Sequence, residues 1–400
     1  MNAPARRPFR VLYILEIFPE ISETFILFGM LGVQRQGIDV RVVSLTNPKS
    51  GAEHHPESGE FLPVTLYLKN VPLYKQYAAL IRMLIFHPVK LVKFTRYLYG
   101  VEKYVRDTRD RLLQVCYLCV KAQGGRIDHI HAHFANLATS FAMWIHMLTG
   151  IPFTFSSHGY DIFYVFPKDM RLKTDLAKKH LTVSRQSAAY IQEKIGNCNG
   201  KLVPLYSGID TNFFSFNPDQ NRDNILLHVA RLHPVKGQQY LIRACRLLKD
   251  RGLDFQCLII GEGEERTKLE QLITELKLKD TCLLLGPKTR KELAPYYQRA
   301  KVFVLTSVSE GLGNVLKEAL ACGLPAVGPR VGGIPEIIID GKTGYLFEKG
   351  NVEELAEKIS ALWNDPRQRA AFAKNGRKFI EENFDYRRQS EKMAALWKEK

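Results

Sequence analysis

The chain has 400 residues, too many for one ordinary hydrophobic core, so we expect two domains of roughly 150 to 200 residues each. Its composition of 46% hydrophobic, 10% aromatic and 24% charged residues is that of a globular protein, and its seven scattered cysteines exclude a small disulfide scaffold and favour a reducing compartment. The formal charge of +16 predicts anionic partners, namely phosphorylated small molecules, anionic lipid or nucleic acid.

The first apolar run, FRVLYIL, follows basic residues and so looks like the start of a signal peptide. It is too short for one and is ended by Glu16 and Pro19, so we expect a first strand instead. In the stretch FPEISETF that follows, we expect a helix with Ser22 as its N-cap, Glu23 in its first turn and an end near Gly37. No apolar run reaches the roughly 18 to 20 residues that cross a bilayer, so we do not expect a transmembrane protein.

Short β-rich runs alternate with helical periods along almost the whole chain, which predicts the α/β class with parallel sheets covered by helices. The strands expected in the first half are FRVLYIL, DVRVVSL, VTLYL, DHIHA, PFTFSS, LTVS and KLVPLY. After a polar, proline-containing linker, a second doubly wound sheet is predicted from NILLHVA, FQCLIIG, TCLLLG, KVFVLTS and LPAVG. We therefore expect domains at 1–210 and 224–384, a linker at 211–223, and a helix at 385–400 that packs back on the first domain.

Ligands of open parallel sheets bind where the strands end and loops lead into helices. In HVARLHPVKGQ, Arg231 follows a strand and Lys236 stands at a helix start, an arrangement suited to a diphosphate. From these residues alone, two solvated surface cations are an equally good interpretation. In IIGEGEE, Gly261 and Gly263 would let the backbone approach a flat ligand, although such glycine pairs are common in this kind of sheet.

Two glutamates, Glu310 and Glu318, lie eight positions apart around a glycine turn in SEGLGNVLKEALACG. Glu310 would lie at the turn beside a ligand, and Glu318 further along the helix could accept two hydroxyls of a ribose. Unpaired amides at the helix start would bind sugar hydroxyls or phosphate oxygens, and they belong to the segment Gly311, Leu312, Gly313 and Asn314. The alternative is a capping glutamate followed by an exposed helix acid.

These motifs resemble the signature of the family 4 retaining glycosyltransferases, whose GT-B fold has two Rossmann-like doubly wound domains facing a central cleft. The resemblance is carried by EGLG, KEALACGLPAV and VGGIPEI, and by the earlier RLHPVKG, GEGEE and LVPLYSGIDTNFF. It implies a nucleotide-sugar donor whose diphosphate is held by Arg231 and Lys236, whose ribose is bound by Glu318, and whose sugar faces Glu310. It also implies that no cofactor or metal is needed, and the absence of any D-x-D motif from the chain agrees with this.

In the first domain, SSHGYD places His158 and Asp161 just past a strand. A lone histidine is usually a satisfied polar residue, but the resemblance implies that His158 lines the cleft near the donor sugar and takes part in catalysis. In DHIHAHF three histidines share one face of a strand without a carboxylate or cysteine at ligand spacing, so a metal site is not favoured. We expect His133 to be a cleft residue and His129 and His131 to be structural.

The acceptor side is the least predictable part of the chain. FPEISETF replaces the glycine-rich loop of many family members, a departure that resembles a branch of polysaccharide-assembly enzymes. The acceptor-side residues that we expect are His133, Asp161, Ser22, Glu23 and Thr24.

The region 75–111 is strongly basic and aromatic. Apolar residues recur there at helical spacing, namely Tyr77, Leu80, Ile81, Leu84 and Ile85, and Lys90, Lys93 and Arg96 are expected to form a cationic face beside Leu91, Phe94, Leu98 and Tyr99. A surface of this kind binds an anionic membrane leaflet. The alternative is a pair of ordinary covering helices with solvated lysines.

Together these features predict a metal-independent, retaining glycosyltransferase that is cytoplasmic and peripheral on the inner face of the membrane. Its expected partners are a nucleotide sugar and a saccharide or polyprenyl-linked acceptor in the assembly of bacterial exopolysaccharide or lipopolysaccharide. Another activity of the same fold, such as nucleotide-sugar epimerisation, is the enzymatic alternative. A nucleic-acid-binding protein is disfavoured because the charge is spread and no base-stacking surface is evident, and a silent membrane-associated partner is disfavoured by the intact site motifs.

Overall fold

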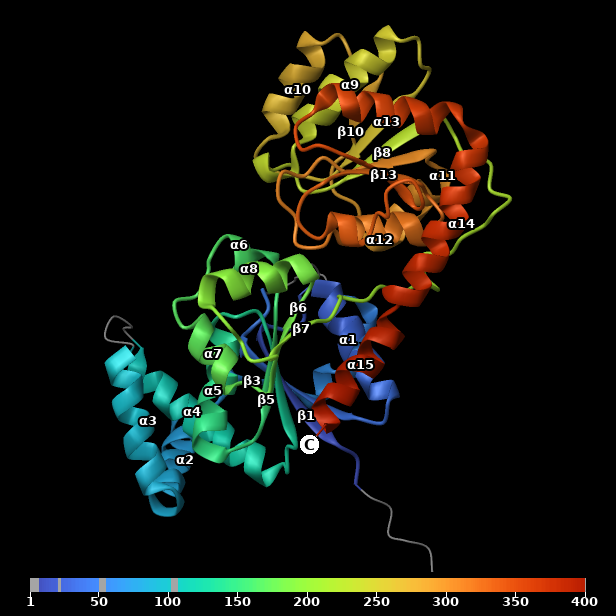
Figure 1. Cartoon of the computed structure of the whole chain (residues 1–400). Helices are drawn as coiled ribbons and strands as arrows, with labels where there is room; N and C mark the ends of the chain where they lie inside the picture. Colours follow the sequence, from blue (N-terminus) through green and yellow to red (C-terminus); the bar gives the residue numbers. More distant parts are fainter. Residues whose placement is uncertain (1–6, 21–22, 50–54, 102–106, 400) are drawn as a thin grey trace, which may run out of the picture. The chain divides into compact units, whose positions relative to one another are not determined.

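The computed structural model of the protein, drawn in Figure 1, describes residues 7–20, 23–49, 55–101 and 107–399. The chain forms two compact units, and each contains one parallel sheet. The first unit comprises Met1–Val183, Ala188–Leu205 and Gln389–Lys400, and the second comprises Ser184–Ser187 and Tyr206–Arg388.

The sheet of the first unit has seven parallel strands in the order β3-β2-β1-β4-β5-β6-β7. The strands are β1 (Arg10–Ile17), β2 (Asp39–Thr46), β3 (Thr65–Tyr67), β4 (His129–His133), β5 (Phe153–Ser157), β6 (Lys179–Thr182) and β7 (Leu202–Pro204). All seven strands expected in this half of the sequence are confirmed. Strand β1 is buried from Val11 to Leu15, which is why it reads as a continuous apolar run in the sequence.

Helices connect these parallel strands, as parallel pairing requires. They are α1 (Thr24–Arg35), α2 (Leu73–Phe86), α3 (Pro88–Val101), α4 (Thr108–Gly124), α5 (Leu137–Thr149), α6 (Gly159–Phe163), α7 (Met170–Leu176) and α8 (Arg185–Ile195). The expected start of α1 was wrong. The helix begins at Thr24 after Glu23, whose side chain makes no capping bond, and it ends at Arg35 before Gly37. Ser22 lies outside the described residues.

Helix α15 (Tyr386–Lys398) contributes a buried aromatic side chain to the first unit. The indole nitrogen of Trp397 donates a hydrogen bond of 2.9 Å to the hydroxyl of Thr154 in β5. The same ring packs against Tyr13, His129 and His131, with centroid separations of 6.0, 5.6 and 5.4 Å. Residues from far along the sequence therefore complete the core of this sheet.

The sheet of the second unit has six parallel strands in the order β10-β9-β8-β11-β12-β13. They are β8 (Ile225–Val229), β9 (Gln256–Ile260), β10 (Cys282–Leu284), β11 (Val302–Val304), β12 (Ala326–Pro329) and β13 (Gly344–Phe347). The first five are confirmed, whereas the sequence analysis missed β13. This strand is only four residues long and extends the sheet by pairing Tyr345 with Val327.

Helices also connect the strands of the second unit and follow the last of them. They are α9 (Gln238–Asp250), α10 (Arg266–Glu275), α11 (Arg290–Arg299), α12 (Asn314–Ala321), α13 (Val352–Asn364) and α14 (Pro366–Asn383). Thr289 and Glu292 form a capping box at α11, and Asp365 accepts the amide of Gln368 at 2.9 Å at the start of α14.

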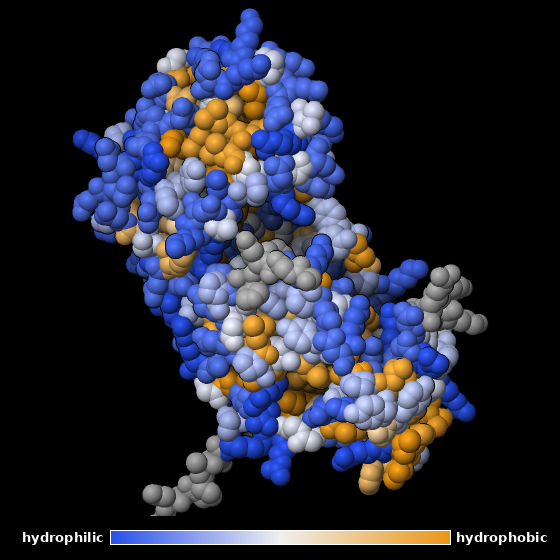
Figure 2. Space-filling model, turned by 180° about the vertical axis from the view of Figure 1, so that it is seen from behind, coloured by the Kyte–Doolittle hydropathy of each residue, from blue (hydrophilic) through white to orange (hydrophobic). Residues whose placement is uncertain are grey.

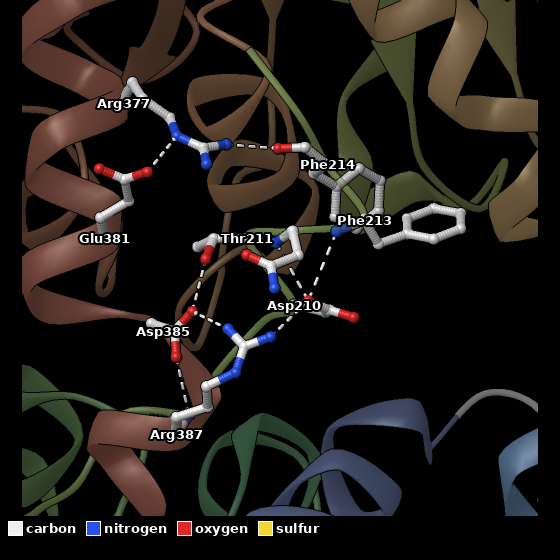
Figure 3. A network of polar contacts seen from close by, with 9 residues as sticks. Asp210, Thr211, Phe213, Phe214, Arg377, Glu381, Asp385 and Arg387 are labelled. Carbon is white, nitrogen blue, oxygen red and sulfur yellow. Dashed lines mark hydrogen bonds and ion pairs between the residues drawn. The ribbon is translucent and has the colours of Figure 1, made fainter.

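The segment 211–223 lies within the second unit. Figure 3 shows the hydrogen bonds and ion pairs that join the start of this segment to α14 and to the first turn of α15. Asp385 accepts a hydrogen bond from Thr211 at 2.5 Å, and Arg377 donates one to the carbonyl of Phe214 at 2.5 Å. Arg387 pairs with Asp385 at 2.8 Å and with Asp210 at 3.3 Å.

Within the described part of the chain, every helix is too short or too polar to cross a membrane.

Candidate active site

The loops that follow β8 and β11 meet at one edge of the second sheet, because these two parallel strands are neighbours. The amide of Val308 donates to the carbonyl of Val235 at 2.8 Å, and the hydroxyl of Thr306 donates to the carbonyl of Lys236 at 3.0 Å. Residues that are about 70 positions apart in the sequence therefore form one surface.

An ion pair lies at the centre of this surface. The ammonium of Lys236 donates to a carboxylate oxygen of Glu310 at 2.6 Å, and the side chains are only 19% and 15% exposed. The hydroxyl of Ser307 donates to the same oxygen at 3.2 Å. The sequence predicted separate roles for these two residues, Lys236 toward the diphosphate and Glu310 toward the donor sugar. The structure places them in direct contact.

Gly237 explains how Lys236 reaches this position. Its φ of +64° is in the left-handed region, and a Cβ there would lie 2.3 Å from the carbonyl oxygen of Thr306. Only glycine allows the start of α9 to come so close to the neighbouring loop.

Arg231 lies exposed beside these loops. The side-chain amide of Gln238 donates to its carbonyl at 2.8 Å, so its backbone is held. Its guanidinium forms no hydrogen bond or ion pair with the rest of the described chain. A fixed backbone and an uncommitted guanidinium suit an anion-binding role.

The glycine pair after β9 has a different immediate role from the one expected. A Cβ on Gly261 would lie 1.9 Å from the carbonyl oxygen of Ala230, and one on Gly263 would lie 2.2 Å from that of Leu232. The two glycines let this loop lie directly against the backbone around Arg231. They shape the site through the β8 loop, and their expected contact with a ligand stays a prediction.

The turn before α12 presents amides that have no acceptor among the residues described. They belong to Gly311, Leu312 and Gly313, and Gly313 takes a left-handed φ of 81° at the N-cap before Asn314. The loop 331–336 packs against this turn, because the carbonyl of Glu310 accepts the amide of Gly333 at 3.3 Å. Free amides at the start of a helix favour a bound anion or sugar hydroxyl.

Glu318 lies one turn further along α12 and is joined to a residue that the sequence analysis did not single out. One carboxylate oxygen accepts a hydrogen bond of 2.8 Å from the hydroxyl of Tyr297, which is fully buried. Burial raises the pKa of Glu318, while this hydrogen bond and the charges of Arg290 and Lys317 oppose the rise. Tyr297 therefore orients the carboxylate that is expected to bind the ribose.

Lys317, the residue before Glu318 in α12, is completely buried. Its ammonium donates to the hydroxyl of Ser207 at 2.9 Å, and burial lowers its pKa to about 7. This contact fixes α12 to the segment that opens the second unit.

In the first unit, His158 follows β5 and lies between two aromatic rings. The ring centroids of Phe25 and Phe134 are 4.7 and 4.6 Å from that of His158. Its Nε2 is 3.1 Å from Nδ1 of His133, and the two imidazoles are stacked. Burial lowers the pKa of His158 to about 3, so at neutral pH it is an uncharged hydrogen-bonding group.

Asp161 holds the backbone around His158. Its carboxylate accepts the amides of His158 at 2.7 Å and Ala135 at 2.6 Å. Burial raises its pKa to about 6, against the effect of these hydrogen bonds. The geometry therefore gives Asp161 an organising role, and its expected place on the acceptor side stays a prediction.

The other two histidines of β4 share one partner. His129 Nε2 and His131 Nδ1 lie 2.9 and 2.8 Å from the hydroxyl of Thr154, and both imidazoles are fully buried. Their contacts are those of structural residues.

Of the acceptor-side residues expected at the start of α1, Thr24 directly precedes a ring of this cluster. Thr24 is the first helical residue and is followed by Phe25, the ring that packs on His158. The pKa of Glu23 is raised to about 7, first by burial and then by repulsion from Glu20 and Glu16. Phe25 was missed because an aromatic residue in an apolar helix reads as ordinary core.

Comparisons with known proteins agree with this geometry. The profile of the family described as Glycosyltransferase Family 4 matches residues 30–213, and that described as Glycosyl transferases group 1 matches residues 210–379. Glycosyltransferase MJ1178 of Methanocaldococcus jannaschii is 31% identical over 262 residues, which cover 63% of this chain and 70% of that protein. The chain belongs to the family 4 glycosyltransferases.

A second relative of this family 4 glycosyltransferase matches almost end to end. WcaL of Escherichia coli strain K12, whose name assigns it to colanic acid biosynthesis, is 28% identical over 97% of this chain and 99% of its own length. The solved structure of Anabaena Alr3699/HepE in complex with UDP has a TM-score of 0.71, with 18% identity over 97% of this chain and 99% of that one. This last likeness shows the GT-B fold, with its two parallel sheets and their helices.

Membership in family 4 establishes the class of enzyme. The protein is a retaining-family glycosyltransferase that uses a nucleotide-sugar donor, and its relatives include enzymes of polysaccharide biosynthesis.

Proposed function

We propose that this enzyme transfers a sugar from a nucleotide-sugar donor, without a metal ion, to a saccharide carried on a lipid during assembly of a bacterial surface polysaccharide. The observation that carries the proposal is the contact between Lys236 and Glu310 beside the free amides of the turn before α12. The full-length similarity to WcaL supports the polysaccharide context.

The donor would bind at the loops of the second unit, at 224–384. Its diphosphate would compete with Glu310 for the ammonium of Lys236, and the guanidinium of Arg231 would add a second cation. Negative charge develops on the diphosphate as the glycosidic bond breaks, so fixed cations and amides aimed there stabilise the transition state. The chain has no D-x-D motif for a metal, and these groups supply positive charge in its place.

Release of Lys236 would leave the carboxylate of Glu310 facing the donor sugar, while Glu318 binds the ribose. The acceptor would attack on the face that the diphosphate leaves, and a phosphate oxygen would take the proton from the acceptor hydroxyl. This course retains the anomeric configuration. The first unit would bind the acceptor with His133, and His158 would take part in catalysis.

A thermal-shift experiment with UDP-, GDP- and ADP-sugars in the presence of a chelator tests the donor assignment. A donor at roughly 100 times its dissociation constant is expected to stabilise the fold by about 2.7 kcal/mol. The matching nucleoside monophosphate is the control, since it lacks the diphosphate contact with Lys236 and is expected to give a smaller shift. If stabilisation requires added Mg²⁺, the metal-free site is wrong.

A peripheral membrane contact would give the enzyme access to a lipid-linked acceptor, and α2 and α3 carry the surface for it. Figure 2 shows hydrophobic side chains gathered at the lower right, where these helices lie. The exposed apolar residues are Leu73, Tyr74, Tyr77, Ile81, Leu84, Ile85, Phe86, Val89, Val92 and Tyr99. Exposed cations lie among them at Lys75, Arg82, Lys90, Lys93 and Arg96. Leu91, Phe94 and Leu98, expected beside the cations, instead point into the core.

Exchanging Lys90, Lys93 and Arg96 for glutamine is expected to weaken co-sedimentation with anionic vesicles by roughly 100-fold, because each basic residue near the surface contributes about 1 kcal/mol. A matched control exchanges three exposed lysines of the second unit, Lys268, Lys279 and Lys378. Equal loss in both triple variants would show that net charge alone binds the vesicles, and unchanged binding in the first would remove α3 from the contact.

A further inference from the structure

A cavity of about 680 Å³ lies in the second unit, away from the loops described above. It is enclosed by the segment 216–222, the turn 323–325 and one face of α14. Lys301 and Pro325, which line it, directly precede β11 and β12, so the cavity is at the amino ends of these strands. The loops that are expected to bind the donor follow the carboxyl ends of β8 and β11. The cavity and the candidate active site are therefore at opposite edges of one sheet.

Every charged residue that lines this cavity is a cation. The four are Arg222, Lys301, Arg369 and Lys374, and no carboxylate is among the lining residues of the described chain. A volume of this size is typical of small-molecule sites, which occupy about 300 to 1,000 Å³.

The partners of these cations are neutral. Arg222 donates to the carbonyls of Tyr297, Gln298, Ala300 and Cys322 at 2.8 to 3.0 Å. Lys301 bonds to the side-chain oxygen of Asn224 and lies 4.4 Å from the ring centroid of Trp363, while Arg369 donates to the carbonyls of Leu362 and Trp363. Their positive charge is thus not matched by an ion pair within the described residues.

The lowered pKa values of three of these groups agree with a positive charge that is only partly compensated. Burial lowers the pKa of Arg369, and the charge of Asp365 opposes this shift. Burial lowers the pKa of Arg222 to about 10. The pKa of Lys301 is lowered by burial and then by repulsion from Arg369, which the more distant Asp254 partly offsets. A bound anion would relieve both the repulsion and the cost of desolvation.

We propose that this cavity binds a small phosphorylated organic anion at a site distinct from the donor site. The cations would hold the phosphate, since charge-assisted hydrogen bonds to phosphate oxygens are strong. The apolar part of the wall would contact the organic part of the ligand; it is built by Phe216, Pro218, Pro325, Ala370 and Ala373. The amide side chains of Asn217, Gln220 and Asn221 also line the cavity and would add neutral hydrogen-bonding groups. Such a ligand would bridge the segment 216–222 and α14.

Calorimetric titration of the full chain with inorganic pyrophosphate, in a chelator, tests the site. Two classes of binding are expected, one at the donor loops and one in the cavity. Lys236→Ala removes the first class and leaves the second. Lys374→Glu raises the dissociation constant of the second class by roughly tenfold or more and leaves the first, because an attractive charge becomes repulsive. The exposed position of Lys374 keeps the fold intact.

Arg367→Glu is the matched control, since Arg367 is an exposed cation of α14 that does not line the cavity. It is expected to leave both classes unchanged, and Lys301→Gln is expected to weaken the second. The proposal is overturned if a single class is found that Lys236→Ala abolishes. It is also overturned if Arg367→Glu weakens binding as much as Lys374→Glu, which would mean that only the net charge attracts the anion.

Discussion

Replacing Lys236 with alanine is expected to lower turnover by roughly 10²- to 10³-fold, as is typical when one preorganised group that stabilises developing charge is removed. The Lys236 side chain is only 19% exposed and its ammonium lies 2.6 Å from Glu310, so the positive charge that it supplies is held at a fixed position in the site. The partner carboxylate keeps its hydrogen bond from Ser307, which limits the loss of fold stability. The measurement is the rate of sugar transfer at saturating donor, together with urea unfolding of the same variant.

Lys268→Ala provides the control for this experiment. Lys268 also lies 2.6 Å from a glutamate, Glu265, but the side chain of Lys268 is 72% exposed and belongs to α10, outside the loops that follow β8 and β11. An exposed pair of this kind contributes little, so transfer is expected to stay normal. Glu310→Ala is expected to lower turnover strongly as well. Near-normal transfer by both Lys236→Ala and Glu310→Ala would contradict the site assignment.

Gly332→Ala is expected to have the largest effect on stability, about 2 to 4 kcal/mol, and to impair donor binding. Gly332 has a φ of +54°, and an added Cβ would lie 1.7 Å from the carbonyl oxygen of Glu310. The new Cβ would clash with a backbone atom and not with the end of a flexible side chain, so the turn that carries Glu310 must move. Urea unfolding gives the loss of stability, and the affinity for the nucleotide-sugar donor reports the displacement of the turn.

Gly341→Ala separates the clash from the strain of the backbone conformation. Gly341 has a similar φ of +71°, but an added Cβ would meet no atom within 4 Å. This variant is expected to lose only the roughly 1 to 2 kcal/mol of a left-handed non-glycine residue and to bind donor normally. If the two variants lose equal stability and donor affinity, the packing of Gly332 on the Glu310 turn has no functional importance.

The sequence predicted most of the fold because long apolar runs identify buried parallel strands. It missed β13, since four residues give no period from which to recognise a strand. It also placed Leu91, Phe94 and Leu98 beside the exposed cations of α3, whereas they face the core. Helical spacing shows that residues share a face but does not show which face is covered, and that depends on the packing of α3 within its unit.

The sequence indicated which residues belong to the site, but it did not indicate which of them contact one another. Arg231, Lys236 and the turn before α12 were predicted to belong to the site because they are cations and glycines that follow predicted strands. The direct pairing of Lys236 with Glu310 joins residues 74 positions apart and follows only from the adjacency of β8 and β11. Tyr297 and Phe25 gave no signal at all, because an aromatic residue in a helix has the same pattern whether it supports a catalytic group or fills a core.

The placement of Trp397 bears on how the protein is made. The first unit draws its residues from both ends of the described chain, and this indole closes the core around Tyr13, His129 and Thr154. During translation the ribosome produces the whole second unit, through Arg388, before it reaches Trp397 in α15. The sheet that is synthesised first therefore has an uncovered apolar surface until Trp397 has been synthesised, and in that interval it needs protection from aggregation.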